Sequence, residues 1–330
     1  MKIKFLSRND VQQSVTMSQA IEAIRQAFIS LAQKKAILPL RTQVAVKEHH
    51  GITLFMPAYL PESESLGAKI VSVFPQNTRN DLPTIHAIVI ICDAKTGQPA
   101  ALIDGTYMTA LRTGAVSGVA TDLLARKGTR TAAIIGAGIQ GRTQLEAICN
   151  VRDIRNVLVY DTNPQVAEAF AEEMKNRGKP IPRDISAVSS PEKAVSEADV
   201  ICAATTSSSP VFDDAHLKPG VHINGIGSYT PEMQEIPEKT VVRARIVVDS
   251  LSACLEEAGD IIIPIQKGLI SQSHIRGELG HVASALLTIR ESEEDITLFK
   301  SVGLAIQDVA VAKLALQRAD DLRLGMDLDF

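Results

Sequence analysis

The chain has 330 residues, 45% of them hydrophobic, which favours two packed domains, and its net charge of −4 excludes a strongly basic face for nucleic acid. No apolar run approaches the ~20 residues that cross a bilayer, and the first ten residues lack a signal peptide's apolar core, so no membrane association is expected. Four widely spaced cysteines without a CxxC pair predict free thiols and a cytoplasmic protein.

The first part of the chain predicts an α+β arrangement. Thr16 and Gln19 have the spacing of a capping box, and residues 20–32 then repeat apolar side chains at helical intervals. Segments rich in β-branched residues follow and are separated by Pro, Gly, Asn and Asp. They lie at 41–46, 51–59, 66–74 and 84–93, and residues 93–104 predict a hairpin with Lys95, Thr96 and Gly97 at its tip.

The pattern changes after Gly105. Residues 106–128 form a long run of small residues at helical spacing, which ends at Lys127 and Gly128. Strand-like and helix-like segments then alternate, which is typical of βαβ units and a parallel sheet. Residues 298–319 begin as a strand and continue as a long apolar helix.

The stretch IIGAGIQGR contains three glycines at the spacing G-x-G-x-x-G, after a buried-type strand and at the start of a predicted helix. Gly136 permits the tight turn, Gly138 lets the backbone approach a pyrophosphate, and Gly141 lets helix and strand pack closely. The phosphates of a dinucleotide would lie at the N-terminus of this helix, where free N–H groups favour negative charge.

An acidic residue follows at the position that a dinucleotide site requires. Asp161 ends the next predicted strand, 20 residues beyond Gly141. Its carboxylate would accept hydrogen bonds from the ribose hydroxyls and repel a 2′-phosphate. NAD(H) is therefore favoured, and NADP(H) stays an alternative because Arg142 could support that phosphate.

Five segments together resemble the ornithine cyclodeaminase/mu-crystallin family, and the resemblance runs from about residue 20 to 318. It implies an α/β fold in which a Rossmann dinucleotide-binding domain (121–299) is inserted into an α+β substrate and dimerisation domain (1–120 plus 300–330). It also implies a homodimer that exchanges hydride between NAD(P) and C2 of a small 2-amino or 2-imino acid. The segments are ALRTGAVSGVA, GAGIQGR, YDTNP, HINGIGSYTPEMQEI and LFKSVGLAIQDVAVAK.

The resemblance also assigns roles to individual residues. Arg41, Lys69 and Arg112 match positions that bind the substrate carboxylate, which cationic side chains suit well. Thr84 matches a position at the substrate and the nicotinamide. The expected catalytic residues are Lys69 and Arg112, from the resemblance, and Tyr229, which could either relay a proton or pack on the substrate ring. No metal is expected. The expected cofactor contacts are Thr84, Arg112, Gly136, Gly138, Ile139, Gln140, Gly141, Asp161, Thr205, Ile226, Gly227, Ser228 and Ser301.

The sequence departs from the family's cyclodeaminases at two acidic positions. Tyr229 stands where they carry an Asp expected to transfer protons, and Leu54 stands where they carry a Glu that can hold a distal amine. Oxidising an amine and closing a ring needs a base, which typically contributes ~10²–10⁴-fold. Reducing a cyclic imine needs only a held carboxylate, a protonated nitrogen and a hydride.

These departures predict an NAD(P)H-dependent reductase of cyclic 2-imino carboxylates. The expected substrate is Δ1-pyrroline-2-carboxylate, giving L-proline, or its six-membered homologue Δ1-piperideine-2-carboxylate, giving L-pipecolate. Three alternatives stay open: an alanine-type amino-acid dehydrogenase, an ornithine cyclodeaminase, and a non-enzymatic, nucleotide-bound ligand carrier like mu-crystallin.

Overall fold

The computed structural model describes residues 2–329. The chain divides into two compact units, Met1–Arg112 with Leu304–Phe330, and Thr113–Gly303. The divisions fall inside helix α3 (Gly105–Leu124) and just before helix α11 (Ala305–Leu322), whereas the sequence placed them near residues 120 and 300. Between residues 2 and 329, no helix combines the length and hydropathy needed to cross a bilayer.

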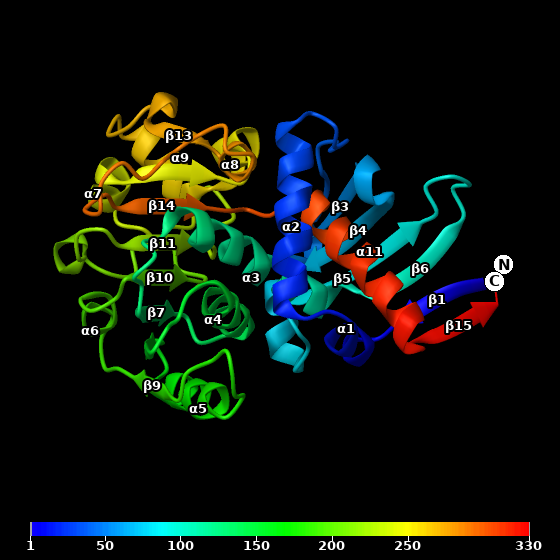
Figure 1. The fold of residues 1–330 in the computed structure, drawn as a ribbon, viewed down its shortest axis with the longest axis horizontal. Helices are drawn as coiled ribbons and strands as arrows, with labels where there is room; N and C mark the ends of the chain where they lie inside the picture. The colour runs from blue at the N-terminus through cyan, green and yellow to red at the C-terminus, as the bar shows by residue number, and fades with distance from the viewer. Residues whose placement is uncertain (1, 330) are drawn as a thin grey trace. The chain divides into compact units, whose positions relative to one another are not determined.

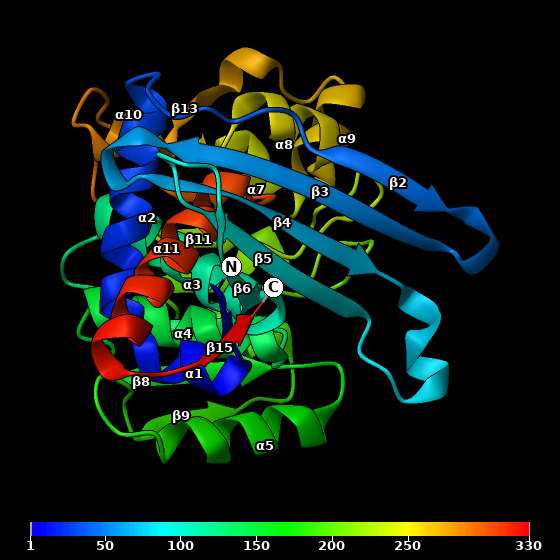
Figure 2. The same ribbon diagram turned by 90° about the vertical axis from the view of Figure 1, so that its right-hand side faces the viewer.

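The first unit is built on a seven-stranded sheet with the order β15-β1-β6-β5-β4-β3-β2 (Figures 1 and 2). β1 runs parallel to β6, and the other neighbouring pairs are antiparallel. The strands are β1 (Lys2–Leu6), β2 (Thr42–Val46), β3 (Gly51–Leu60), β4 (Ser65–Val73), β5 (Ile85–Cys92), β6 (Pro99–Asp104) and β15 (Met326–Asp329).

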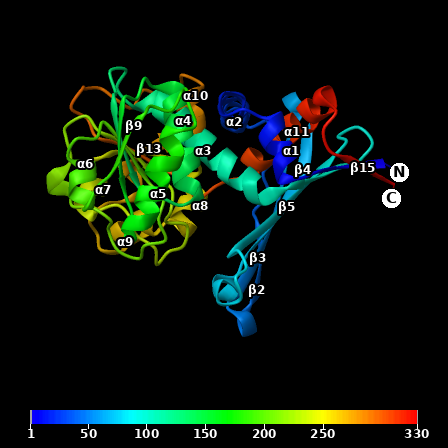
Figure 3. The same ribbon diagram turned by 90° about the horizontal axis from the view of Figure 1, so that it is seen from below.

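Helices α1 (Arg8–Ser14), α2 (Met17–Ala32) and α11 belong to the same unit. The capping box predicted at Thr16 is confirmed. The Thr16 side chain accepts a hydrogen bond from the Gln19 N–H, and the Gln19 side chain accepts one from the Thr16 N–H. α11 packs against α2 and against β3, β4 and β5, so the helices cover one face of the sheet (Figure 3).

The strand register divides the residues of the sheet between two faces. Lys69 of β4 lies opposite Met56 of β3 and Val89 of β5 on the face that is buried. The neighbouring row, Phe55, Ile70 and Ile88, points to the opposite face. Lys69 is therefore carried on the helix-covered, apolar face of the sheet.

The second unit holds an eight-stranded, wholly parallel sheet with the order β13-β12-β14-β11-β10-β7-β8-β9 (Figure 1). Buried apolar clusters pack on both faces, as expected for βαβ architecture. The strands are β7 (Thr131–Ile135), β8 (Asn156–Tyr160), β9 (Asp184–Ala187), β10 (Val200–Ala203), β11 (His222–Gly225), β12 (Arg245–Val248), β13 (Ile275–Glu278) and β14 (Thr297–Lys300).

The chain enters this sheet at β7, runs outward through β8 and β9, and returns to the other side of β7 at β10. Ligands of open α/β sheets bind outside the carboxyl ends of the strands at such a reversal of order. The helices are α4 (Ile139–Val151), α5 (Pro164–Lys175), α6 (Pro191–Val195), α7 (Glu238–Arg243), α8 (Leu251–Glu257), α9 (Gly259–Gln266) and α10 (Leu279–Ala283).

Candidate functional site

A buried cluster of charged side chains occupies the first unit. The Lys69 Nζ atom lies 2.9 Å from both carboxylate oxygens of Asp308, and Arg112 Nε lies 3.1 Å from Asp308 Oδ1. Arg112 also donates to Gln307 Oε1 at 2.6 Å. β4, α3 and α11 each contribute to this cluster, and no more than 6% of any of the four residues is exposed.

The electrostatics of the cluster depend on two cations sharing one carboxylate. Burial and the adjacent Arg112 lower the pKa of Lys69 to about 8, although Asp308 opposes this shift. The charge of Arg41 also contributes to this lowering of the pKa. With Lys69 protonated, Lys69 and Arg112 outweigh Asp308 by one positive charge, so the cluster suits one added carboxylate.

The cluster also has an unused donor. The Nε2 atom of Gln307 is buried and makes no hydrogen bond among the residues that the structure describes. A buried donor without a partner is costly, and a bound acceptor would relieve that cost. Two predicted substrate residues, Lys69 and Arg112, are thus joined through the carboxylate of Asp308. Asp308 and Gln307 were not among the predicted site residues.

Thr84 lies outside this cluster. It precedes β5, and its carbonyl accepts a hydrogen bond from the Phe74 N–H at 2.8 Å. Lys69 pairs with Val89, five positions further along β5, which at ~3.3 Å per residue separates Thr84 from Lys69 by about 16 Å along the strand. Thr84 and Lys69 therefore do not meet within the first unit.

In the second unit, the glycine turn has the shape that its spacing predicts. Gly136 has φ +97°, and a Cβ added there would lie 2.6 Å from the Ala204 carbonyl oxygen. Nothing lies within 4 Å of a Cβ added at Gly138, which is the N-cap of α4 and supplies no side-chain cap. The helix N-terminus therefore presents open backbone to which a phosphate fits.

The other turn residues support the same fit. A Cβ at Gly141 would lie 2.3 Å from the Gly136 carbonyl oxygen, so the helix packs closely on the turn. Ile139 is 58% exposed, and the side-chain oxygen of Gln140 is buried without a partner among residues 2–329. This arrangement fits a dinucleotide across the α4 N-terminus.

Asp161 braces this turn. Its Oδ2 accepts a hydrogen bond from the Ala137 N–H and its Oδ1 accepts one from the Asn163 N–H, both at 2.9 Å. Arg142 is held elsewhere, because its Nε pairs with Glu173 at 2.7 Å and its Nη1 donates to the Ala137 and Gly138 carbonyls. Arg142 is thus already committed to contacts within the protein.

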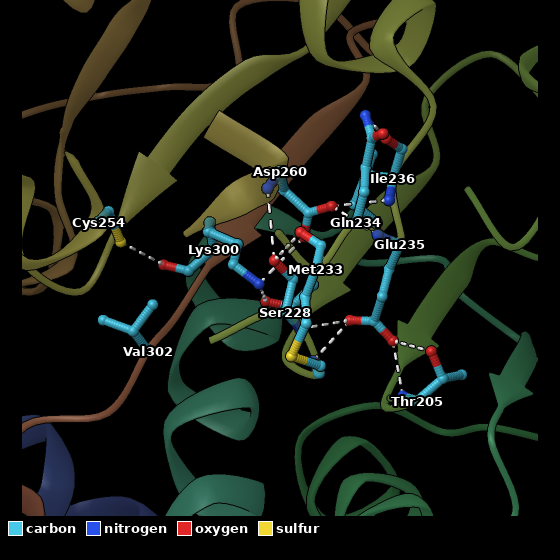
Figure 4. Close-up of polar contacts among 12 residues, drawn as sticks. Thr205, Ser228, Met233, Gln234, Glu235, Ile236, Cys254, Asp260, Lys300 and Val302 are labelled. Carbon is cyan, nitrogen blue, oxygen red and sulfur yellow. Dashed lines mark hydrogen bonds and ion pairs between the residues drawn. The ribbon is translucent and has the colours of Figure 1, made fainter. Parts of the chain in front are cut away.

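The loops after β10 and β11 converge on one buried carboxylate, that of Glu235 (Figure 4). Thr205 donates its N–H at 2.6 Å and its hydroxyl at 2.8 Å to Oε1. Gly227 and Ser228 donate their N–H groups to Oε2 at 2.6 and 3.0 Å, and the N–H of Ile226 goes to Ala203. These predicted cofactor residues therefore donate to protein acceptors.

A second pair of buried charges supports Glu235. Asp260 accepts the N–H groups of Glu235 and Ile236 at 2.7 and 2.9 Å. Lys300 Nζ lies 3.1 Å from Asp260 Oδ2 and donates to the Gly225 carbonyl at 3.0 Å (Figure 4). Burial raises the pKa of Glu235, although Lys300 opposes that shift.

Ser301 and Tyr229 complete the predicted set. The Ser301 hydroxyl donates to Asp249 at 2.7 Å, and the same carboxylate oxygen accepts the N–H groups of Val302 and Gly303. Asp249 therefore shapes the loop that joins β14 to α11. Tyr229 lies in the loop after β11 with 40% of its surface exposed, and partial burial raises its pKa.

A model of the ornithine cyclodeaminase/mu-crystallin family matches residues 1–322. The chain belongs to this family. A Delta(1)-pyrroline-2-carboxylate reductase of Bacillus cereus is 40% identical over 327 residues, which cover 98% of this chain and 99% of the relative.

Solved structures of the family agree with the fold. The Delta(1)-pyrroline-2-carboxylate reductase of Thermococcus litoralis, in complex with NADH and L-proline, is 45% identical with a TM-score of 0.94, and the match covers 99% of this chain and 100% of the other. An archaeal alanine dehydrogenase dimer with bound NAD is 36% identical with a TM-score of 0.92 and full coverage of both chains. The predicted α/β class with a Rossmann domain in an α+β domain is confirmed.

The family resemblance did not predict the buried polar residues that bind and position the predicted site residues. Asp308 and Gln307 lie in the quoted segment LFKSVGLAIQDVAVAK, where they read as polar positions of an apolar helix. Glu235 and Lys300 also lie in quoted segments, and Asp260 follows a Gly that approaches the Met233 carbonyl closely. A buried charge inside an apolar stretch was the available signal.

Proposed function

We propose that the protein is an NADH-dependent reductase of cyclic 2-imino carboxylates, with Δ1-pyrroline-2-carboxylate reduced to L-proline as its preferred reaction. The observation that carries the proposal is the buried Lys69–Arg112–Asp308 cluster, with its one excess positive charge on an apolar sheet face. Two relatives of similar length, one of them with a solved structure, are named Delta(1)-pyrroline-2-carboxylate reductases, which adds support.

The cations hold the substrate and the cofactor supplies the hydride. Lys69 and Arg112, with Arg41 nearby, bind the carboxylate and so fix the position of C2. Bound NADH supplies a hydride to C2, while the electron pair of the C=N bond moves to the protonated ring nitrogen. Lys69 and Tyr229 are our candidates for keeping that nitrogen protonated, and Gln307 Nε2 offers a further donor.

The surroundings of Lys69 suit a hydrocarbon ring. Its cross-strand neighbours are Met56 and Val89, and Leu54 lies two residues before Met56 on the same face. An apolar wall accommodates the ring methylenes of a pyrroline or a piperideine. The distal ammonium of ornithine would find no carboxylate at Leu54, and this disfavours cyclodeamination.

The nucleotide site favours NADH over NADPH. The carboxylate of Asp161 would meet a 2′-phosphate with like charge, and Arg142 is engaged by Glu173 and two backbone carbonyls.

The four cysteines are unpaired thiols, which supports the proposal of a cytoplasmic protein.

An NADH-oxidation assay with each substrate class tests the proposal. Activity with Δ1-pyrroline-2-carboxylate alone, and a lower kcat/KM with NADPH, is the expected result. Activity that requires pyruvate and free ammonia would indicate an amino-acid dehydrogenase instead. Ammonia release from ornithine would indicate a cyclodeaminase, and tight NADH binding without turnover of any substrate would indicate a carrier.

The activity should decline at alkaline pH. Lys69 is charged below its pKa of about 8 and neutral above it, so carboxylate binding weakens as the pH rises through that value. We expect kcat/KM for the imine, measured at saturating NADH from pH 6 to 10, to fall above about pH 8. The Lys69→Arg variant keeps its charge, so its kcat/KM should not fall above about pH 8. The same alkaline fall in both proteins would contradict the assignment of this titration to Lys69.

We further propose that two copies associate through the outer face of the first unit's sheet. Phe55 and Ile88 are 41% and 40% exposed there, and Ile70 lies between them in the same row. The row beside it extends across β6 to Phe5 of β1, which is 38% exposed. An apolar face of this extent typically marks an interaction surface, and a second copy would bury it.

The oligomeric state tests this proposal. Sedimentation velocity should give twice the chain mass of 35.5 kDa for the wild type and a single chain mass for Ile88→Glu, because a charge buried in an apolar interface is costly. Val166→Glu, at a 38% exposed position of α5, serves as the matched control and should leave the dimer intact. A dimeric Ile88→Glu protein would show that the copies associate elsewhere.

A further inference from the structure

The carboxylate of Glu235 joins two loops that follow neighbouring strands of the parallel sheet. One oxygen takes both donors of Thr205, which comes after β10, and the other takes the N–H groups of Gly227 and Ser228, after β11. Figure 4 shows the Glu235 side chain reaching Thr205, with Asp260 and Lys300 close by. All four donors are satisfied by a single side chain that has no exposed surface.

The two loops approach one another closely at this point. A Cβ added at Gly227 would lie 2.1 Å from the Thr205 carbonyl oxygen and 2.5 Å from Glu235 Oε1, so only glycine fits. The Thr205 loop in turn adjoins the glycine turn, because the Ala204 carbonyl oxygen occupies the space beside Gly136. The loops after β7, β10 and β11 are therefore held in one fixed arrangement.

The backbone of Glu235 is fixed by two further buried charges. Asp260 accepts the backbone N–H groups of Glu235 and Ile236, and the ammonium of Lys300 pairs with Asp260. Lys300 also donates to the carbonyl of Gly225, the last residue of β11. Asp260, paired with Lys300, thus fixes the backbone of the residue whose side chain joins the loops.

We propose that Glu235 is a positioning residue for the nicotinamide nucleotide. Its carboxylate holds the loops after β10 and β11 at the spacing that the bound nucleotide requires. The inference rests on the proposed function, since it takes NADH as the ligand. The loops lie at the carboxyl edge of the sheet, beside the reversal of strand order where dinucleotides bind.

Burying a carboxylate for stability alone is a poor arrangement, because apolar side chains of similar volume are often as stable or more so. A carboxylate, however, can accept hydrogen bonds from two loops at once. The lengths of these hydrogen bonds then fix the distance between the loops. The donors that it occupies cannot bind the nucleotide directly. Their loops contribute shape and carbonyl oxygens, and Glu235 sets that shape.

The test is a direct titration of NADH, followed by steady-state kinetics, on Glu235→Gln. Glutamine places an NH2 group against the N–H donors of one loop, so that loop is released. We expect the NADH dissociation constant to rise at least tenfold, while kcat at saturating NADH stays within about threefold and KM for the imine is unchanged. Glu232→Gln, an exposed residue three positions away, is the matched control and should bind NADH like the wild type.

A milder variant covers the case in which Glu235→Gln does not fold. Thr205→Val removes one of the four donors and leaves the buried charges in place, and it should raise the NADH dissociation constant about threefold. Unchanged NADH affinity in the folded variants, or a loss confined to kcat, would overturn the proposal. Wild-type protein that binds NADH but reduces no imine would refute the proposed function alone, because the titration still tests Glu235.

Discussion

Replacing Lys69 with alanine should reduce kcat/KM for Δ1-pyrroline-2-carboxylate by at least about 10³-fold and leave the affinity for NADH nearly intact. The ammonium of Lys69 is one of two cations in the cluster, and its loss leaves Asp308 paired with Arg112 alone. The site would then carry no excess positive charge to attract the substrate carboxylate. If Lys69 also keeps the ring nitrogen protonated, loss of this proton-transferring group reduces kcat/KM by a further ~10²–10⁴-fold.

Two further variants isolate the charge from the packing. Lys69→Met retains most of the side-chain volume and should be as inactive as Lys69→Ala. Lys35→Ala removes a surface lysine of the same unit, paired with Glu62 at 3.0 Å and 55% exposed, and should be fully active. Stopped-flow reduction and NADH fluorescence separate chemistry from nucleotide binding, and a Lys69→Ala enzyme with most of its activity would remove Lys69 from the mechanism.

The second large effect is expected at Asp308. Asp308→Asn leaves Lys69 and Arg112 as adjacent buried cations, and breaking a buried pair in this way typically costs ~3–5 kcal/mol of stability. Because Asp308 raises the pKa of Lys69, removing the Asp308 charge lowers that pKa from its value of about 8. Lys69 should then be largely neutral at pH 8, and kcat/KM should fall by about 10²-fold there.

The pH profile distinguishes this effect from simple unfolding. In Asp308→Asn the alkaline fall of kcat/KM should move to lower pH, so that part of the activity returns at pH 6. Urea unfolding monitored by circular dichroism reports the loss of stability separately. Asp320→Asn, at an exposed position of the same helix, is the control and should match the wild type in both measurements. A profile whose midpoint does not move would show that Asp308 does not govern Lys69.

The local structure was predictable wherever short-range chemistry determines it. The capping box at Thr16, the β-branched strands between residues 42 and 104, and the glycine turn at residues 136–141 each carry their signal within a few positions. The alternation of strands and helices predicted the parallel sheet for the same reason. The edge strand β15 and its neighbour β1 were missed, because the two ends of the chain pair with each other and short segments such as MDLD lack an apolar pattern.

The candidate site was predictable only in part. The glycine spacing indicated the nucleotide turn, and the resemblance indicated Lys69 and Arg112. Asp308 escaped notice because it lies 239 positions from Lys69 and its helix reads as apolar core. Glu235 was not predicted because three of its four donors are backbone N–H groups, which no side-chain pattern in the sequence indicates. Such contacts follow from register and loop packing, which a sequence does not display.

The most direct test follows the hydride itself. Wild-type protein is incubated with Δ1-pyrroline-2-carboxylate and NADH that carries deuterium at one or the other of its two C4 positions, and the product is analysed by NMR and mass spectrometry. We predict L-proline with deuterium at C2 from one of the two labelled cofactors and none from the other. Absence of proline, or proline without deuterium in both reactions, would contradict hydride transfer to C2.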